Sequence, residues 1–246
     1  MALNKELDYR LRWLDFDRHG HIRPTTVLDL LQDVATIQAE EMGIGRDDML
    51  ARGVFWAVVR LKYEVIKEPV HYQVVRVRTW PHTPTSFSFM RDFSIRDEAG
   101  DLLIKASSEW VLMDIESRKF VKVTDHYTGS EDFDEERSFQ GRLRKIADFG
   151  EDTLPTYEVV PTLSDIDVNG HVNNARYPSF VMDALETCSY ASVRSMQIDY
   201  RHEALPGEPL VIHAHVEDSH VSAKGVRADG AIAFACSIEM SEALSS

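Results

Sequence analysis

The sequence predicts an α+β protein made of two similar domains in tandem, each with one long helix and an antiparallel sheet. A short segment occurs twice, as Asp15-Phe-Asp-Arg-His-Gly-His-Ile22 and as Asp165-Ile-Asp-Val-Asn-Gly-His-Val172, with an offset of 150 residues. A helical apolar pattern follows each copy, and a series of strand-like segments follows the first helix. A repeat at this spacing indicates one fold present twice, and a helix followed by a strand meander favours the α+β class.

Composition sets the broad class of the protein. A chain of 246 residues is long enough for two domains, and 43% hydrophobic with 28% charged residues is typical of globular proteins. The net charge of −14 argues against a nucleic-acid partner. The N-terminal residues lack the apolar region of a secretory signal, and the longest apolar run, 54–59, is too short to span a membrane. We therefore expect a cytoplasmic protein, with Cys188 and Cys236 as buried core thiols.

The first half is predicted to run strand, turn, helix and then a strand meander. Tyr9 to Phe16 is strand-like, and a turn follows at His19-Gly20. Pro24 is well placed near a helix start, and apolar residues at 27, 30, 31, 34 and 37 predict a helix over 25–41 that ends near Gly43. The expected strands are 55–65, 74–80, 87–96 and 102–114, with turns at 97–100 and 116–119.

The second half repeats this plan after a polar, acidic connection. Residues 124–153 are interpreted as the link between the domains, partly helical around 134–146. Beyond it we expect a strand over 157–164 and a helix whose apolar face carries Tyr177, Phe180, Val181, Ala184, Leu185 and Cys188. The remaining expected strands are 195–200, 209–216, 220–227 and 232–240, with turns at 205–207 and 228–230. The predicted domains are 1–130 and 154–246, joined by 131–153.

The second copy of the repeat carries residues that could perform chemistry. Asp167, Asn169 and His171 are two residues apart, so in an extended segment a carboxylate, an amide and an imidazole would project to one side. A turn that only caps the following helix explains the same residues equally well. No second His or Cys stands at a matching metal-ligand spacing, and the chain has no Gly-x-Ser-x-Gly elbow. We therefore expect no metal and no cofactor.

The helix that follows could contribute to such a site. It is expected to begin between residues 174 and 178, with Asn173 and Asn174 as candidate caps. The free N–H groups at a helix start, next to an acid, an amide and a histidine, can stabilise a developing oxyanion.

Residues 165–177, Asp-Ile-Asp-Val-Asn-Gly-His-Val-Asn-Asn-Ala-Arg-Tyr, closely resemble the signature of the acyl-acyl carrier protein thioesterases, the plant plastid enzymes and their bacterial relatives. The resemblance extends over essentially the whole chain. It includes Tyr200-Arg-His-Glu-Ala204, Arg78-Thr-Trp-Pro81, Arg91-Asp-Phe93 and Ser108-Glu-Trp-Val111.

The resemblance implies a tandem, or double, hotdog fold, each hotdog having a long helix wrapped by an antiparallel sheet. It also implies hydrolysis of the thioester between a fatty acyl chain and the phosphopantetheine arm of acyl carrier protein. In such a protein the N-terminal hotdog, 1–130, houses the acyl chain, and the C-terminal hotdog, 154–246, is catalytic.

Carried over by resemblance, the catalytic residues are Asp167, Asn169, His171 and Glu203. Plant members have a Cys after that Glu, and this chain has Ala204, so a carboxylate or an activated water must attack the thioester. In the first copy Asp17 and His21 match the acid and the imidazole, but His19 replaces the amide and no Glu clearly matches Glu203. We therefore expect a structural role for the first copy.

The acyl chain and the carrier protein each need a surface. The candidates for lining the apolar tunnel are Val34, Ile37, Met42, Phe55, Trp56, Phe87 and Phe89, each of which core packing alone also explains. A basic patch for an acidic carrier could include Arg142, Arg144 and Lys145.

Other functions compete with this interpretation. A thioesterase acting on acyl-coenzyme A would use the same chemistry, and a non-catalytic acyl-binding module would keep the cavity without turnover. A dehydratase of the same fold is disfavoured because the chain has no His-Phe-x-Gly-x-Pro motif. A monomer and a homodimer are both compatible with a tandem hotdog.

Overall fold

The computed structural model describes residues 3–129, 132–149, 156–185 and 192–241. The chain divides into two compact units. The first comprises residues 1–13 and 29–143, and the second comprises residues 14–28 and 144–246. The domain boundaries inferred from the sequence stay a prediction.

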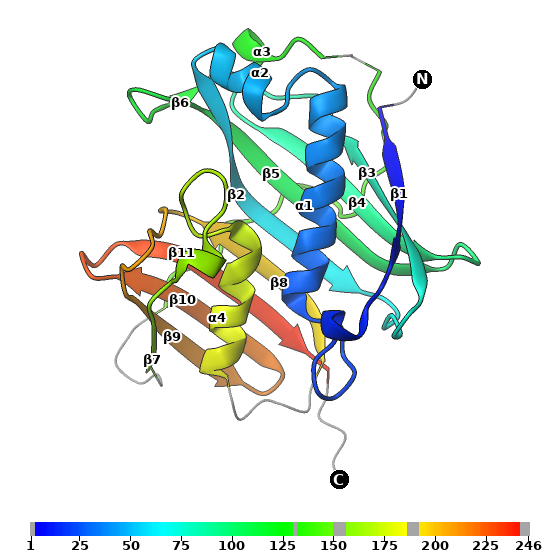
Figure 1. Ribbon diagram of the computed structural model, residues 1–246, viewed down its shortest axis with the longest axis vertical. Coiled ribbons are helices and arrows are strands. Elements are labelled where there is room, and N and C mark those ends of the chain that lie inside the picture. The colour runs from blue at the N-terminus through cyan, green and yellow to red at the C-terminus, as the bar shows by residue number, and fades with distance from the viewer. Residues whose placement is uncertain (1–2, 130–131, 150–155, 186–191, 242–246) are drawn as a thin grey trace. The chain divides into compact units, whose positions relative to one another are not determined.

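The first unit is an antiparallel sheet with a long helix on one face (Figure 1). Its strands lie in the order β1-β3-β4-β5-β2, and β6 pairs with β5. The strands are β1 (Lys5–Arg10), β2 (Val54–Val65), β3 (Val74–Pro81), β4 (Phe89–Asp97), β5 (Leu102–Asp114) and β6 (Phe120–Val121). The helices are α1 (Pro24–Glu41), whose residues 24–28 belong to the second unit, and the short α2 (Arg46–Ala51) and α3 (Val123–His126).

Helix α1 confirms the helical pattern predicted over 25–41. Val27, Leu31 and Val34 are buried at spacings of four and three residues, as on one face of a helix. The helix ends before Gly43, whose φ of +67° is a backbone conformation that glycine adopts readily. The expected strands of this half match β2 to β5 closely, whereas α2, α3 and β6 were not predicted.

The second unit repeats the plan with a shorter helix (Figure 1). Its antiparallel strands lie in the order β8-β11-β10-β9-β7. They are β7 (Thr156–Val159), β8 (Val193–Tyr200), β9 (Leu210–Glu217), β10 (His220–Arg227) and β11 (Ile232–Met240), with helix α4 (Tyr177–Ala184) on the sheet. Cys236 is buried as expected, whereas Cys188 lies outside the described residues. The α+β class is confirmed, and no helix in the described part of the chain is long and apolar enough to cross a membrane.

The strands predicted just before each copy of the repeat are partly wrong. Strand β1 lies earlier than the predicted 9–16, and Trp13–Asp15 form a 3-10 turn with Trp13 exposed. Likewise β7 ends at Val159, and Leu163–Asp165 form the matching 3-10 turn. There the Asp165 carboxylate accepts the N–H of Thr162 at 2.8 Å and its hydroxyl at 3.1 Å. These local side-chain bonds turn the chain and end the strand.

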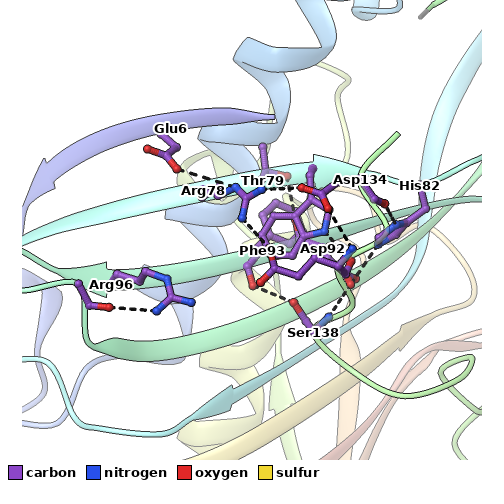
Figure 2. Close-up of polar contacts among 12 residues, drawn as sticks. Glu6, Arg78, Thr79, His82, Asp92, Phe93, Arg96, Asp134 and Ser138 are labelled. Carbon is purple, nitrogen blue, oxygen red and sulfur yellow. Dashed lines mark hydrogen bonds and ion pairs between the residues drawn. The ribbon is translucent and has the colours of Figure 1, made fainter. Parts of the chain in front are cut away.

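The helix predicted around 134–146 is also wrong, because residues 132–149 contain no helix. Their polar groups bond to the sheets instead. In the first unit Arg78 pairs with Asp134 and Glu136, and the Asp92 carboxylate accepts the Ser138 N–H at 2.7 Å (Figure 2). In the second unit, backbone groups of residues 146 and 149 bond to side chains of the sheet. The N–H of residue 146 donates to Asp199, its carbonyl accepts from Arg201, and the carbonyl of residue 149 accepts from Lys224. Backbone groups occupied in this way are not available for helical hydrogen bonds.

Asp92 anchors this segment from a buried position, and its removal is expected to destabilise the first unit. The Asp92 and His82 side chains are 3% and 1% exposed, and Oδ2 and Nε2 lie 3.1 Å apart (Figure 2). We expect Asp92→Ala to lower the free energy of unfolding by about 3 kcal/mol, because it strips a buried histidine and a backbone N–H of their partner. Urea unfolding measures this. Asp134→Ala, which breaks a more exposed pair, should cost less than about 1 kcal/mol, and equal costs for the two variants would contradict the prediction.

Candidate active site

The second copy of the repeat folds as a tight turn in the second unit. A β-bridge joins Ile166 to Val172, and inside it the Asp167 N–H donates to the carbonyl of His171 at 3.0 Å. The Gly170 N–H donates to the carbonyl of Asp167 at 3.0 Å, and Gly170 has a φ of +81°. The extended segment assumed in the sequence analysis is therefore wrong, and the turn determines which side chains meet.

The turn brings Asp167 and Asn169 into direct contact. Asp167 Oδ1 accepts the backbone N–H of Asn169 at 2.8 Å, and Oδ2 accepts the side-chain amide of Asn169 at 3.3 Å. The first bond is the Asx-turn bond that aspartate commonly makes two residues ahead. The side-chain amide of Asn169 is a hydrogen-bond donor, and the contact at 3.3 Å turns it toward Asp167.

His171 meets the second acid, Glu203. His171 Nε2 lies 3.4 Å from Glu203 Oε2, and the two side chains are 30% and 42% exposed. Glu203 follows β8, and its carbonyl accepts a hydrogen bond from Arg227 Nη1 at 2.9 Å. The Val172 N–H donates to the Ala204 carbonyl at 3.0 Å, which ties the Glu203 loop to the turn. The four residues carried over by resemblance thus form two contacting pairs, on a turn and on a loop bonded to it.

A helical segment begins next to the turn, as expected. The Asn173 side chain caps it by accepting the N–H of Ala175 at 2.8 Å, and a 3-10 turn, Asn174–Arg176, leads into α4. Asn173 is therefore confirmed as a cap. Tyr200 donates its hydroxyl to the carbonyl of Asn174 at 3.0 Å, so this start is fixed to β8.

Among the residues that the structure describes, no thiol takes part in this arrangement. Ala204 is fully buried, and Cys236, also fully buried, has a pKa raised by that burial, which leaves it an inert thiol. Among the described residues, no group of three or more His, Cys, Asp or Glu side chains is arranged to hold a metal ion. The chemistry available comes from two carboxylates, an imidazole and an amide.

The first copy of the repeat folds in the same way. A β-bridge joins Phe16 to Ile22, and the Asp17 N–H donates to the carbonyl of His21 at 2.8 Å. Asp17 Oδ1 accepts the backbone N–H groups of His19 and His21 at 2.8 and 3.0 Å. The repeat seen in the sequence is thus a repeat of structure, with His19 where the second copy has an amide side chain.

The first half also has an acid at the chain position that corresponds to Glu203, which the sequence analysis missed. After β8, the N–H groups of Arg201 and His202 both donate to one carbonyl of β11, at 2.8 and 3.0 Å. After β2, the N–H groups of residues 66 and 67 both donate to one carbonyl of β5, at 2.8 and 3.1 Å. The next residue is Glu203 in one case and Glu68 in the other. Loops of different length hide this match from a comparison at a fixed offset.

The candidates for contacting the acyl chain have different surroundings in the first unit and on α1. Met42, Trp56 and Phe89 lie in one apolar cluster of the first unit, where the rings of Trp56 and Phe89 stack with centroids 5.5 Å apart. Val34 is fully buried on α1, and Ile37 is half-buried.

The other two aromatic candidates have different surroundings. Phe87 is 53% exposed, and the Phe55 ring lies against the guanidinium of Arg118 at 4.7 Å. The structure therefore brings together three of the predicted lining residues and leaves Phe87 at the surface.

Both halves of the chain match models of one protein family. The acyl-ACP thioesterase N-terminal domain matches residues 4–130, and the acyl-ACP thioesterase C-terminal domain matches residues 150–239. The chain belongs to the acyl-ACP thioesterase family. Among its relatives are a palmitoyl-acyl carrier protein thioesterase of Arabidopsis thaliana, 29% identical over 204 residues, and an oleoyl-acyl carrier protein thioesterase of Coriandrum sativum, 28% identical over 198 residues.

These matches cover 76% and 72% of this chain but 48% and 53% of the relatives, so the chain spans about half the length of the curated proteins it matches. Solved structures share the fold at lower identity. An acyl-ACP thioesterase from Bacteroides thetaiotaomicron has a TM-score of 0.86 at 20% identity, covering 97% of this chain and 98% of that one. The 12:0-ACP thioesterase from Umbellularia californica has a TM-score of 0.89 at 21% identity, covering 98% of each chain. The hotdog fold expected from the sequence is confirmed.

Proposed function

We propose that this protein hydrolyses the thioester of a fatty acyl-acyl carrier protein, releasing a free fatty acid and ending chain elongation. The observation that carries the proposal is the pairing of Asp167 with Asn169 and of His171 with Glu203 on neighbouring segments of the second unit. Family membership of both halves supports it, as do relatives named palmitoyl- and oleoyl-acyl carrier protein thioesterases.

We assign the attack on the thioester to water activated by Glu203 and His171. The two side chains contact each other and are both partly exposed, so a water molecule can reach them and a proton can pass between them. The Asp167 carboxylate already accepts two hydrogen bonds from Asn169. Its role in the proposal is to aim the Asn169 amide at the developing oxyanion, together with N–H groups at the start of the helical segment.

The acyl chain and the carrier protein occupy other surfaces in this proposal. The cluster that contains Met42, Trp56 and Phe89 is apolar and supports binding of the chain in the first unit. Arg142, Arg144 and Lys145 are all exposed, which supports contact with an acidic carrier.

Thiol release from a panel of thioesters tests the proposal. C8 to C18 acyl chains are presented on acyl carrier protein and on coenzyme A, with Asp167→Ala as the inactive control. We expect turnover of the carrier-protein esters, a maximum at one chain length, and loss in the variant. Faster turnover of the coenzyme A esters would assign the protein to acyl-CoA instead. Absence of turnover with either carrier, in a folded protein, would leave an acyl-binding module.

A further inference from the structure

Glu203 lies on a short loop, residues 201–204, whose backbone is held at several points in the second unit. At the start of the loop, two N–H groups donate to one carbonyl of β11, at 2.8 and 3.0 Å. At its end, the carbonyl of Ala204 accepts the N–H of Val172 at 3.0 Å. Between these points, the carbonyl of Glu203 accepts a hydrogen bond from Nη1 of Arg227 at 2.9 Å. This last bond comes from a side chain, so a substitution can remove it and leave the backbone bonds in place.

Arg227 is itself well fixed, because it ends β10 at the hairpin that leads to β11. Its N–H donates to the carbonyl of Ala231 at 2.9 Å, and its carbonyl accepts the N–H of Gly230 at 2.9 Å. In the same hairpin, Oδ2 of Asp229 lies 3.2 Å from Nη2 of Arg227. The guanidinium is planar and rigid, so this contact at Nη2 also sets the direction of Nη1. Arg227 therefore connects the hairpin to the backbone of Glu203.

The contacts of Arg227 are those of a residue that holds Glu203 in place and leaves its charge unpaired with the arginine. The ion-pair partners of Arg227 are Asp229 at 3.2 Å and Glu208 at 3.9 Å, both through Nη2. Its contact with Glu203 is to the backbone carbonyl. The Glu203 carboxylate lies against His171 instead, with Oε2 3.4 Å from Nε2. Arg227 thus acts on the position of the acid.

The third nitrogen of the guanidinium group supports the same conclusion. Within the part of the chain that the structure describes, Nε of Arg227 is buried and has no hydrogen-bond partner. A buried donor without a partner is destabilising. The side chain therefore takes an orientation that serves the Glu203 carbonyl and Asp229 and leaves one of its own donors unpaired.

We propose that Arg227 is a positioning residue for the hydrolysis: its bond to the Glu203 carbonyl keeps the Glu203 side chain against His171. This inference rests on the proposed thioesterase function. Arg227 acts through Glu203 and does not touch the substrate, so its loss lowers kcat and leaves KM nearly unchanged.

The kinetics of Arg227→Met test the proposal, because methionine keeps an unbranched stem and removes every donor. We expect kcat for the carrier-protein thioester to fall about 10-fold, since small displacements of a reacting group are costly, with KM changed less than about twofold. In a Glu203→Ala background the same change should cost nothing further, because the group being positioned is gone. Wild-type kcat in Arg227→Met, or the same fold loss with and without Glu203, would overturn the proposal.

Arg227→Lys separates the geometry of the arginine from its charge. Lysine keeps the positive charge but lacks the planar fork that joins Asp229 to the Glu203 carbonyl. We therefore expect kcat to fall about 3-fold or more in this variant as well. Full activity of Arg227→Lys beside a slow Arg227→Met would assign the effect to the charge and contradict the positioning role.

Arg23→Met is the matched control in the first copy of the repeat. Nε of Arg23 donates to the carbonyl of Phe16 at 2.9 Å, so the variant also removes a bond from an arginine to a backbone carbonyl. It should leave kcat within about twofold of wild type, with or without Glu203. A loss of kcat as large as that of Arg227→Met would show that the effect is not specific to Glu203, which counts against the proposal.

Crystal structures of the wild-type protein and of Arg227→Met give a measurement that does not depend on activity. We expect the separation of His171 Nε2 and Glu203 Oε2 to increase in the variant beyond the 3.4 Å of the intact protein. An unchanged separation would refute the positioning role. A wild-type protein that hydrolyses no thioester would instead refute the proposed function, so the two failures are distinguishable.

Discussion

Replacing Glu203 by alanine is expected to lower kcat/KM for the acyl carrier protein thioester about 10²-fold or more. Glu203 contacts His171 at 3.4 Å, and without it no carboxylate remains to accept the proton of the attacking water through that histidine. Glu203→Gln should be as inactive as Glu203→Ala, because the amide keeps the shape but cannot act as a base. Thiol release under kcat/KM conditions measures both variants.

A second His–Glu pair in the same unit provides the control. His220 Nδ1 lies 2.7 Å from Glu239 Oε1, with side chains 42% and 51% exposed, so the pair resembles His171–Glu203 in chemistry and exposure. Glu239→Ala should leave kcat/KM within about twofold of wild type, since exposed ion pairs contribute little to stability. Near-normal turnover of Glu203→Ala would remove Glu203 from the mechanism and leave Asp167 as the acid that acts.

The sequence predicted elements well where a periodic pattern ends at a turn. The strands expected over 102–114, 220–227 and 232–240 agree with β5, β10 and β11 at both ends. Gly100 and Gly230, with φ of +90° and +81°, form the turns between these strands and their neighbours, and such residues are visible in a sequence. Residues 132–149 show the opposite case. Their shape depends on bonds to Asp92 and other distant side chains, which no local pattern reveals.

The sequence predicted which residues form the candidate site, but it did not predict how their side chains contact one another. The spacing of Asp167, Asn169 and His171 identified a constellation, but the assumption of an extended segment gave the wrong reason for their proximity. Their contacts depend on a turn closed by backbone bonds. Glu68 was missed because it stands 135 residues before Glu203, whereas the repeat offset is 150. Only the matching backbone bonds after β2 and β8 make the two acids comparable.

Substitutions of Asp167 should affect kcat/KM differently from those of Glu203, because the shape of the Asp167 side chain is expected to matter more than its charge. Asp167→Ala is expected to lower kcat/KM about 10²-fold or more, because it removes both bonds that hold Asn169. Asp167→Asn should lose clearly less, since its side-chain oxygen can still accept the Asn169 N–H and keep the turn. Thiol release compares the two variants at equal protein concentration.

A variant in the first copy of the repeat provides a control that distinguishes loss of catalysis from loss of a turn. Asp17 makes the same Asx-turn bond to the residue two positions ahead, at 2.8 Å, so Asp17→Ala removes an equivalent turn. It should lower the free energy of unfolding by about 1 kcal/mol and change kcat/KM less than about twofold. If Asp167→Asn were instead as inactive as Asp167→Ala while Asp17→Ala stayed active, the charge of Asp167 would be essential, and Asp167 would replace Glu203 as the group that attacks the thioester or activates the water.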